Sequence, residues 1–127
     1  MLTNATMSTV LPVSDVDRAA AFYRDRLGLQ DLGDVPGGNH ALRTTAGATI
    51  ELMEAEPGAQ SHHTAATFGV SDLPQEVAEL ESRGVAFEDY DLPELKTVGH
   101  IATHGDDRAA WFTDTEGNIL CLHEAPR

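Results

Sequence analysis

The chain has 127 residues, 41% of them hydrophobic, and its 21 acidic and 8 basic residues give a formal net charge of −13. This length predicts a single domain, residues 1–127, with enough apolar material for a core. The negative charge repels nucleic acid and anionic membranes, which we exclude as partners, and it favours cationic small molecules. Solubility alone would also explain the charge.

The cysteine content and the hydropathy of the chain indicate in which compartment the protein is expected. Cys121 is the only cysteine, so we expect no disulfide within the chain and no zinc cluster of thiolates. The first ten residues lack a basic segment followed by an apolar one, and no apolar run approaches the roughly 20 residues that span a bilayer. We therefore expect a cytoplasmic protein.

An internal repeat organises the chain. The tetrad Val-Ser-Asp-Val at residues 13–16 returns as Val-Ser-Asp-Leu at residues 70–73, 57 positions later. Each tetrad opens a helical pattern in which a serine or aspartate is suited to cap the helix and apolar residues follow at helical spacing. Gly28 and Gly84 are the predicted helix stops. Two modules of the same order are therefore predicted.

Strands surround each predicted helix. Short strand-like runs precede the helices at residues 6–12 and 64–70, and hairpin-like strands follow them. Residues 47–54 align with residues 117–124, 70 positions later, so the second module has about 13 additional residues. We place these in a loop at residues 91–107.

The predicted fold class is α+β. Two βαβββ modules, at about residues 4–54 and 63–124, are joined by a linker at residues 55–62. Since one such module cannot cover its own sheet, we expect the two to form a curved mixed sheet with the helices on the outside. The inner face of that sheet is the expected place for a ligand.

At these stretches the chain resembles the vicinal oxygen chelate superfamily, which comprises the glyoxalase, bleomycin-resistance and extradiol dioxygenase fold. The matching segments are residues 13–29 (VSDVDRAAAFYRDRLGL), 47–54, 70–84 and 110–124, which ends in an Asp-x-x-Gly-Asn turn and a strand. The resemblance implies the fold and leaves the chemistry open. The superfamily contains metal-dependent isomerases, epimerases, lyases and dioxygenases, and also metal-free proteins that sequester antibiotics as dimers.

The resemblance also implies four strand positions for metal ligands. The repeat places them at Ser8, Glu51, Ala65 and Cys121, where the family normally uses histidine, glutamine or glutamate. Only Glu51 qualifies. A catalytic site keeps about three protein ligands, so we predict no metal and no cofactor.

A displaced metal site stays open as an alternative. Strand alternation puts His63 on the face of Ala65, and His123 on the face of Cys121. Together with Glu51 these histidines would supply three ligands, although two residues along a strand is a displacement of roughly 6.6 Å. Simple exposure to solvent is the alternative explanation of the histidines.

Alternation with the four positions facing inward predicts the inner and outer faces. The inner residues are Ser8, Val10, Pro12, Thr49, Glu51, Met53, His63, Ala65, Thr67, Ile119, Cys121 and His123. The alternate residues are more apolar and should face the helices: Ile50, Leu52, Phe68, Val70, Leu120 and Leu122. His40 is expected to face inward from the strand beside that of Glu51.

Trp111 is the only tryptophan. If the turn at residues 113–118 is tight, Trp111 lies opposite Cys121 and points into the cavity, whereas Phe112 packs beneath a helix. A ring beside small residues suits an aromatic ligand, although filling core volume is an equal alternative. Tyr90 and the predicted loop would form the rim.

We therefore predict a homodimeric binding protein that sequesters a hydrophobic or aromatic natural product or antibiotic without metal; a cationic ligand would suit its charge. No catalytic residue is predicted. One alternative is a lyase or isomerase that uses the displaced metal site or Glu51 as a base, and another is a regulatory domain without a small ligand. The candidate ligand-binding residues are Trp111, Glu51, Ser8, Thr49, Met53, His63, Thr67, Cys121, His40 and Tyr90.

Overall fold

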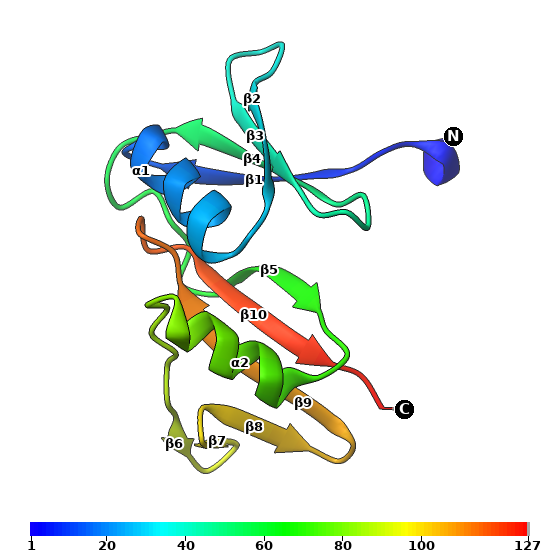
Figure 1. Ribbon diagram of the computed structural model, residues 1–127, viewed down its shortest axis with the longest axis vertical. Coiled ribbons are helices and arrows are strands. Elements are labelled where there is room, and N and C mark those ends of the chain that lie inside the picture. The colour runs from blue at the N-terminus through cyan, green and yellow to red at the C-terminus, as the bar shows by residue number, and fades with distance from the viewer. Residues whose placement is uncertain (127) are drawn as a thin grey trace. The chain divides into compact units, whose positions relative to one another are not determined.

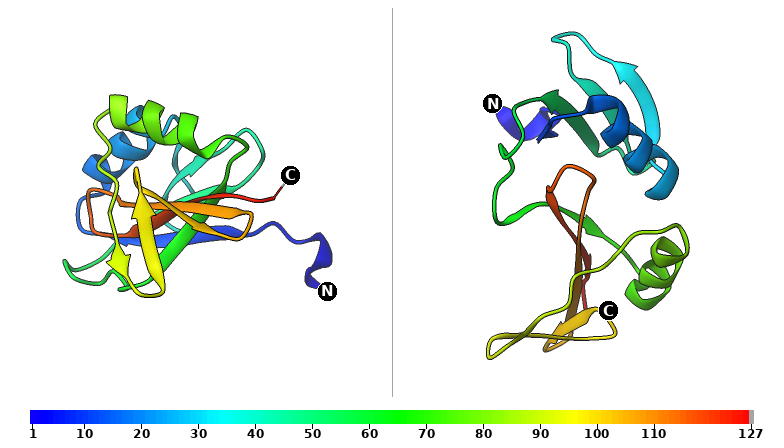
Figure 2. Two further views of the ribbon diagram at one scale, coloured as in Figure 1. Left: turned by 90° about the horizontal axis from the view of Figure 1, so that it is seen from below. Right: turned by 90° about the vertical axis from the view of Figure 1, so that its left-hand side faces the viewer.

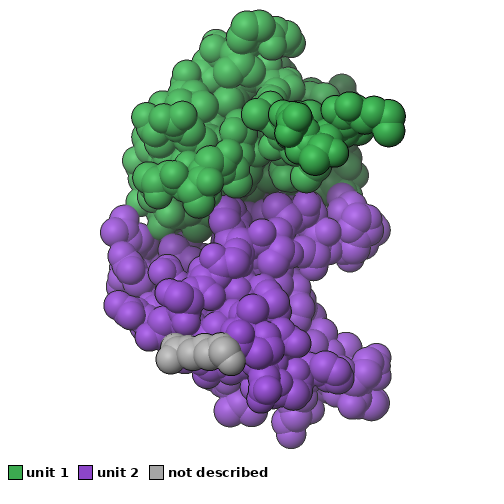
Figure 3. Space-filling view, turned by 90° about the vertical axis from the view of Figure 1, so that its right-hand side faces the viewer, with its two compact units in different colours: residues 1–60 green, residues 61–127 purple. Residues whose placement is uncertain are grey.

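The computed structural model describes residues 1–126 and divides into two compact units, Met1–Gln60 and a second that begins at Ser61 (Figures 1 and 3). The boundary falls in the segment that the sequence predicts as a linker. Each unit holds one mixed sheet and one α-helix, which confirms the α+β fold class. The sheets are separate, one of four strands and one of six.

The first unit has the predicted βαβββ order. Its sheet order is β1-β4-β3-β2, in which β1 runs parallel to β4 and the other pairs are antiparallel. A 3-10 turn, Leu2–Asn4, precedes the sheet. The elements are β1 (Ser8–Val13), α1 (Val16–Ala21), a π-helical turn (Phe22–Arg26), β2 (Gln30–Asp34), β3 (His40–Arg43) and β4 (Thr49–Glu54).

The second unit extends the same plan. Its sheet order is β5-β10-β9-β8-β7-β6, with β5 parallel to β10 and the other pairs antiparallel. The elements are β5 (Thr64–Gly69), α2 (Leu73–Ser82), β6 (Asp91–Leu92), β7 (Leu95–Val98), β8 (Ile101–His104), β9 (Asp107–Thr113) and β10 (Ile119–Glu124).

The prediction of a loop at residues 91–107 is wrong, because this segment forms β6, β7 and β8. Val98 pairs with Ile101, which leaves a two-residue connection, and both of its residues, Gly99 and His100, have positive φ. Positive φ at both central residues matches the twist of a tight hairpin. The additional residues of the second module therefore lengthen its sheet.

The predicted helix caps are present in both units. Asp15 accepts a hydrogen bond from the backbone of Arg18 at 3.0 Å, and Asp72 accepts one from the backbone of Gln75 at 3.2 Å. The first helix ends before Gly28, which has a φ of 78°. Within residues 1–126 no helix is long and apolar enough to cross a membrane.

In each unit the helix covers one face of its own sheet (Figure 2). The apolar residues predicted for this face are buried at four of six positions, namely Ile50, Leu52, Leu120 and Leu122. In the second unit, Leu73, Val77 and Leu80 of α2 are buried on the same side as Phe112 of β9. The opposite face of each sheet is left without a helix from its own unit.

A hydrogen-bonded turn joins β9 to β10 and sets their register. Asp114 is buried and accepts hydrogen bonds from the backbone of Glu116 at 2.8 Å and from the backbone of Asn118 at 2.9 Å. The Asn118 amide donates to the other carboxylate oxygen at 2.9 Å. With this turn closed, Trp111 pairs with Cys121, as the sequence predicts.

Candidate functional site

The face of the second sheet that α2 leaves uncovered carries the lone tryptophan. Trp111 on β9 pairs with Cys121 on β10, which pairs with Thr67 on β5. Since directly paired residues share a face, these three side chains lie on one side of the sheet. Phe112 is fully buried on the other side, whereas Trp111 is only half-buried. The predicted opposite orientations of Trp111 and Phe112 are confirmed.

A β-bulge brings one further residue to this face. The register shifts between Ile119 and Leu120 of β10, so that Thr64 and Ala65 together oppose Ile119. The indole nitrogen of Trp111 donates a hydrogen bond to the Thr64 hydroxyl at 3.2 Å. Sequence alternation missed Thr64 because no glycine or proline marks the bulge.

Because of this bulge, strand alternation no longer places His63 on the same face as Thr67. The alternation that assigned it runs backward from Ala65, and the bulge interrupts it there. The His63 side chain lies instead within 3.2 Å of the backbone carbonyl of Thr64 and is exposed. The prediction that His63 shares the face of Thr67 is therefore wrong.

Tyr90 lies beside Trp111, where the sequence predicts a rim residue. The two rings meet edge to face with their centroids 5.7 Å apart. The backbone N–H of Thr97 donates to the carbonyl of Tyr90 at 2.8 Å, and the backbone N–H of Tyr90 donates to the Thr97 hydroxyl at 2.9 Å, which holds the segment against β7. Burial, followed by the negative charge of Glu88 and, at the alkaline pH where the thiol ionises, that of Cys121, raises the pKa of Tyr90. We call Trp111, Tyr90, Thr64 and Cys121 the Trp111 cluster.

Cys121 is a buried thiol with little nucleophilic character. Burial raises its pKa, and hydrogen bonds involving Thr67 and the backbone of Ala110 offset this only in part. Its sulfur also lies 3.4 Å from the backbone carbonyl of Leu122. Because the thiolate is the form that attacks electrophiles and binds metals, Cys121 is poorly suited to either role at neutral pH.

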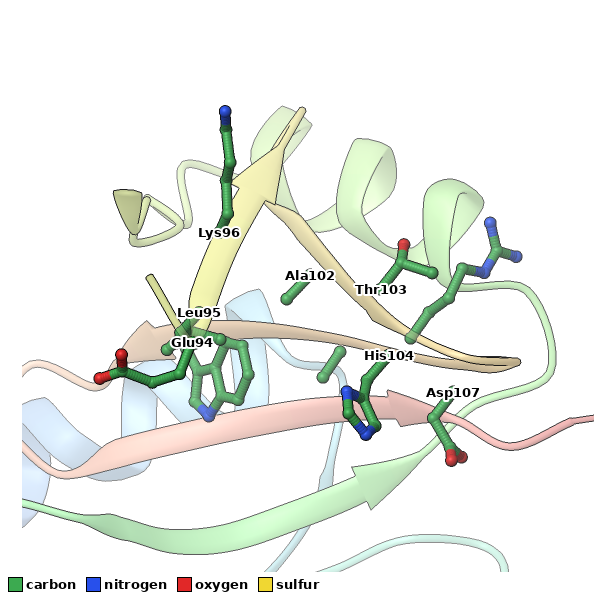
Figure 4. Close-up of a pocket in the computed structure, with 10 residues that line it drawn as sticks. Glu94, Leu95, Lys96, Ala102, Thr103, His104 and Asp107 are labelled. Atoms are coloured by element: carbon green, nitrogen blue, oxygen red, sulfur yellow. The ribbon is translucent and has the colours of Figure 1, made fainter. Parts of the chain in front are cut away.

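A pocket of about 130 Å³ lies next to the Trp111 cluster, wholly within the second unit (Figure 4). The hairpin of β7 and β8 and the start of β9 form it, and Trp111 forms one wall. The sequence predicts the loop at residues 91–107 as part of the rim. Of the residues that line this pocket, only Trp111 is among the predicted ligand-binding residues. The lining residues are Glu94, Leu95, Lys96, Ala102, Thr103, His104, Asp107, Arg108, Ala109 and Trp111.

In the first unit, Glu51 occupies the face that α1 leaves uncovered. It pairs with Val10 on one side and Ala41 on the other, and one of its oxygens accepts a hydrogen bond from the Asn39 amide at 3.2 Å. Asn39 is a partner that sequence analysis did not name. Met53, two residues along β4, lies on the same face and is 41% exposed. This half-buried carboxylate is thus hydrogen-bonded on a partly apolar surface.

Ser8 and Thr49 lie at the edge of that same surface. They pair directly across β1 and β4, two residues before the pair formed by Val10 and Glu51. Ser8 is exposed and Thr49 is half-buried. The register therefore gathers the predicted residues of the first module, other than His40, on one face.

His40 lies on the opposite face, so the prediction that it faces the same way as Glu51 is wrong. It pairs with Leu52, which is fully buried on the helix side. Its ring nitrogens contact Asp31 at 2.7 Å and Asp34 at 3.4 Å. His40 therefore links β3 to β2 through its contacts with Asp31 and Asp34.

Asp31 is held in its charged form. Its carboxylate accepts a hydrogen bond from the backbone of Gly33 at 2.8 Å and contacts His40 and Arg24. The Gly33 bond, acting against burial and assisted by His40 and Arg24, lowers the pKa of Asp31. This cluster stabilises the β2–β3 edge and lies apart from the face of Glu51.

The residues present do not fit a divalent metal. Of the four family positions, Ala65 offers no donor atom and Cys121 is a protonated thiol. For the displaced site, His123 pairs with Gly69, which lies six residues beyond His63, so the two histidines are about 20 Å apart. The prediction of a displaced metal site is therefore wrong, because His63 and His123 are too far apart to bind the same ion. Across residues 1–126, no three His, Cys, Asp or Glu side chains are grouped to hold a metal ion.

The family is established by comparison with known proteins. The model of the Glyoxalase/Bleomycin resistance protein/Dioxygenase superfamily matches residues 6–122, and the chain belongs to this superfamily. Comparison with curated protein sequences finds no match. The fold has many solved relatives.

TnmS3, an antibiotic binding protein from Streptomyces sp. CB03234, has 24% identity and a TM-score of 0.74, covering 100% of this chain and 99% of its own. A superfamily member from Sphaerobacter thermophilus has 23% identity and a TM-score of 0.72, covering 98% and 100%. Lactoylglutathione lyase from Agrobacterium tumefaciens has 19% identity and a TM-score of 0.71, covering 98% and 96%. Such low identities show a shared fold that serves both binding proteins and enzymes.

Proposed function

We propose that this protein binds a hydrophobic, aromatic small molecule, such as a natural product or antibiotic, and sequesters it without chemical change. The observation that carries the proposal is the Trp111 cluster beside a pocket. Trp111 is half-buried on a sheet face, and Tyr90 meets it edge to face at 5.7 Å. Large aromatic side chains next to a cavity supply most of the attraction for flat apolar ligands.

The residues around Trp111 leave room for a ligand. Ala102 and Ala109 pair across β8 and β9, so they lie together on the Trp111 face, and both line the pocket. Two adjacent methyl groups give an apolar surface without filling the space above it. The antibiotic-binding protein TnmS3 shares this fold over the whole chain, which supports a binding role.

The chemistry of the candidate polar groups favours binding over catalysis. Cys121 has a raised pKa, which limits nucleophilic attack, and the four family positions do not make a metal site. Glu51 is the remaining candidate for a general base, and its carboxylate accepts a hydrogen bond from the Asn39 amide at 3.2 Å. We therefore propose that Glu51 offers a polar contact to a ligand on the uncovered face of the first sheet.

Calorimetric titration with a panel of aromatic antibiotics tests the binding role. We expect a ligand whose affinity falls by about 1 to 3 kcal/mol in Trp111→Ala, since stacking and buried area are both lost. Trp111→Phe, which keeps an aromatic ring, should lose less. Equal affinity in wild type and Trp111→Ala would remove the cluster from the site.

Recovery of the bound ligand tests the absence of turnover. Mass spectrometry after prolonged incubation should return the ligand unchanged, and Glu51→Gln should bind it with nearly the same affinity. A product formed by the wild type and abolished in Glu51→Gln would instead establish an enzyme with Glu51 as its base.

We also propose that the protein is a homodimer. Val10 and Met53 are 48% and 41% exposed on the same face of the first sheet, and covering them with a second chain would remove apolar surface from water. Light scattering over a range of concentrations gives the number of chains. A monomer at all concentrations would contradict this part of the proposal.

A further inference from the structure

The pocket beside Trp111 has an unbalanced charge. Two acidic and two basic side chains line it: Glu94, Asp107, Lys96 and Arg108. The guanidinium of Arg108 is bonded to the carboxylate of Glu124 at 2.7 Å, which neutralises it. Arg108 therefore adds little positive charge to the pocket.

The charged groups of Glu94, in the turn between β6 and β7, and of Lys96, in β7, point in different directions. Figure 4 shows the amino group of Lys96 directed away from Glu94 and His104. Within the described part of the chain, the carboxylate of Glu94 has no ion-pair partner, whereas Asp107 contacts the ring of His123 at 3.0 Å. Glu94 thus lines one end of the pocket with a carboxylate that has no ion-pair partner in the described part of the chain, and Asp107 lies at the other end (Figure 4).

The geometry points to a site for an organic cation. We infer that the pocket binds the protonated amine or guanidinium group of an aromatic ligand, with the face of Trp111 and the carboxylate of Glu94 as its two partners. This inference rests on the proposed function and names the class of ligand. A cation over an indole face is attracted by the electron density of the ring, and a carboxylate beside it adds direct charge attraction.

The other lining residues suit the apolar part of such a ligand. Leu95, Ala102 and Ala109 lie between the charged ends and exclude water without offering hydrogen bonds. An anionic ligand would be repelled by Glu94. It would gain little from the two basic residues, because Lys96 points elsewhere and Arg108 is paired with Glu124. The net charge of −13 attracts cations to the protein from a distance.

The test uses two probes with the same ring system: naphthylethylammonium, which is charged, and naphthylethanol, which is neutral. Binding is followed by the NMR signal of the indole N–H, which is unique because Trp111 is the only tryptophan. We expect the ammonium probe to bind about fivefold or more tightly. Raising the ionic strength from about 0.01 M to about 1 M should remove most of this difference without changing the binding of the neutral probe.

Two variants localise the effect. Glu94→Gln should lower the affinity for the ammonium probe about threefold and leave that for naphthylethanol unchanged. Glu79→Gln removes the same charge from an exposed position on α2, on the other side of the sheet, and should preserve the preference. Loss of the preference in both variants alike would show an effect of net charge and overturn the site.

The outcomes separate this inference from the proposed function. Equal affinity for the two probes, or equal weakening of both by Glu94→Gln, overturns the cation site while binding to the Trp111 cluster stands. If neither probe shifts the indole signal and the panel of aromatic antibiotics also fails to bind, both proposals are overturned. If aromatic antibiotics shift the indole signal but neither probe does, only the cation site is overturned.

Discussion

The indole nitrogen of Trp111 donates a hydrogen bond to the hydroxyl of Thr64 at 3.2 Å, across the whole width of strand β10. Thr64 is 47 positions away in sequence and belongs to the parallel edge strand β5. The bond exists because the bulge places both Thr64 and Ala65 opposite Ile119. It restricts the rotation of a half-buried ring and so pre-orients the surface that we propose meets the ligand.

Thr64→Val should loosen the Trp111 ring without changing the volume of the side chain. We expect about 1 kcal/mol or less of weakening in ligand binding and faster hydrogen exchange at the indole N–H, because the exposed hydrogen bond to Thr64 is lost. Calorimetry and NMR measure the two effects. Thr113→Val, at an exposed position on β9, the strand that carries Trp111, serves as the control and should change neither.

Glu124→Gln should destabilise the second unit. The carboxylate of Glu124 is 8% exposed and accepts a hydrogen bond from the backbone of Leu73, the first residue of α2, and another from Arg108, both at 2.7 Å. Loss of its charge leaves a partly buried guanidinium unpaired and weakens the start of α2. We expect a loss of about 2 to 3 kcal/mol in the free energy of unfolding, measured with urea.

Glu79→Gln is the matched control for that measurement. Glu79 forms a 3.3 Å ion pair with Arg83 on the exposed face of α2. An exposed pair contributes about 0.5 kcal/mol or less, so this variant should unfold close to wild type. Similar losses in both variants would contradict a special role for Glu124.

Asp31→Asn should alter the pH dependence of stability. The pKa of Asp31 is lowered in the folded state, chiefly by the hydrogen bond from Gly33, so the charged carboxylate stabilises the fold. This contribution is complete above the unfolded pKa of about 3.9 and is lost as the pH falls through the lower folded pKa. We expect Asp31→Asn to cost about 1 kcal/mol at neutral pH and progressively less in acid. Urea unfolding at a series of pH values checks this, and a constant difference would contradict it.

Cys121 should react slowly with iodoacetamide. Its pKa is raised mainly by burial, so at any pH below that pKa a smaller fraction is thiolate than for a free cysteine. We expect alkylation about tenfold or more slower in the native protein than in urea, with the rate rising at a higher pH. Because the chain has one cysteine, mass spectrometry reports on this site without interference. Equal native and unfolded rates would show that the thiol is accessible.

Removal of metal should leave ligand binding unchanged. Ser8, Glu51 and Cys121 offer one hydroxyl, one carboxylate and one buried thiol, and Ala65 offers no donor atom, so these four positions do not make up a metal-binding set. Dialysis against a chelator, followed by calorimetry, is expected to give the same affinity as untreated protein. Near-stoichiometric zinc, nickel, manganese or iron in the purified protein, with binding that fails after chelation, would point to a metal-assisted function.

Local sequence signals determined the architecture of both modules. The capping residues Asp15 and Asp72, the stop at Gly28 and the turn from Asp114 to Asn118 all act over four or fewer residues, so their effect does not depend on distant contacts. The same turn sets the pairing of β9 with β10 and thereby the orientation of Trp111. For this reason the position of Trp111 could be predicted.

The pairing of distant strands was decided only by the tertiary structure. His40 and His63 were assigned to a face by alternation, but the β3–β4 register and the bulge in β5 put them elsewhere. A single-residue shift reverses every side chain beyond it, and no local residue records such a shift. Thr64, Asn39 and the pocket at Glu94 were missed for the same reason. Periodicity in the chain therefore determined the folds of the two modules, whereas the contacts around Trp111 and Glu51 depend on registers set by packing between segments far apart in sequence.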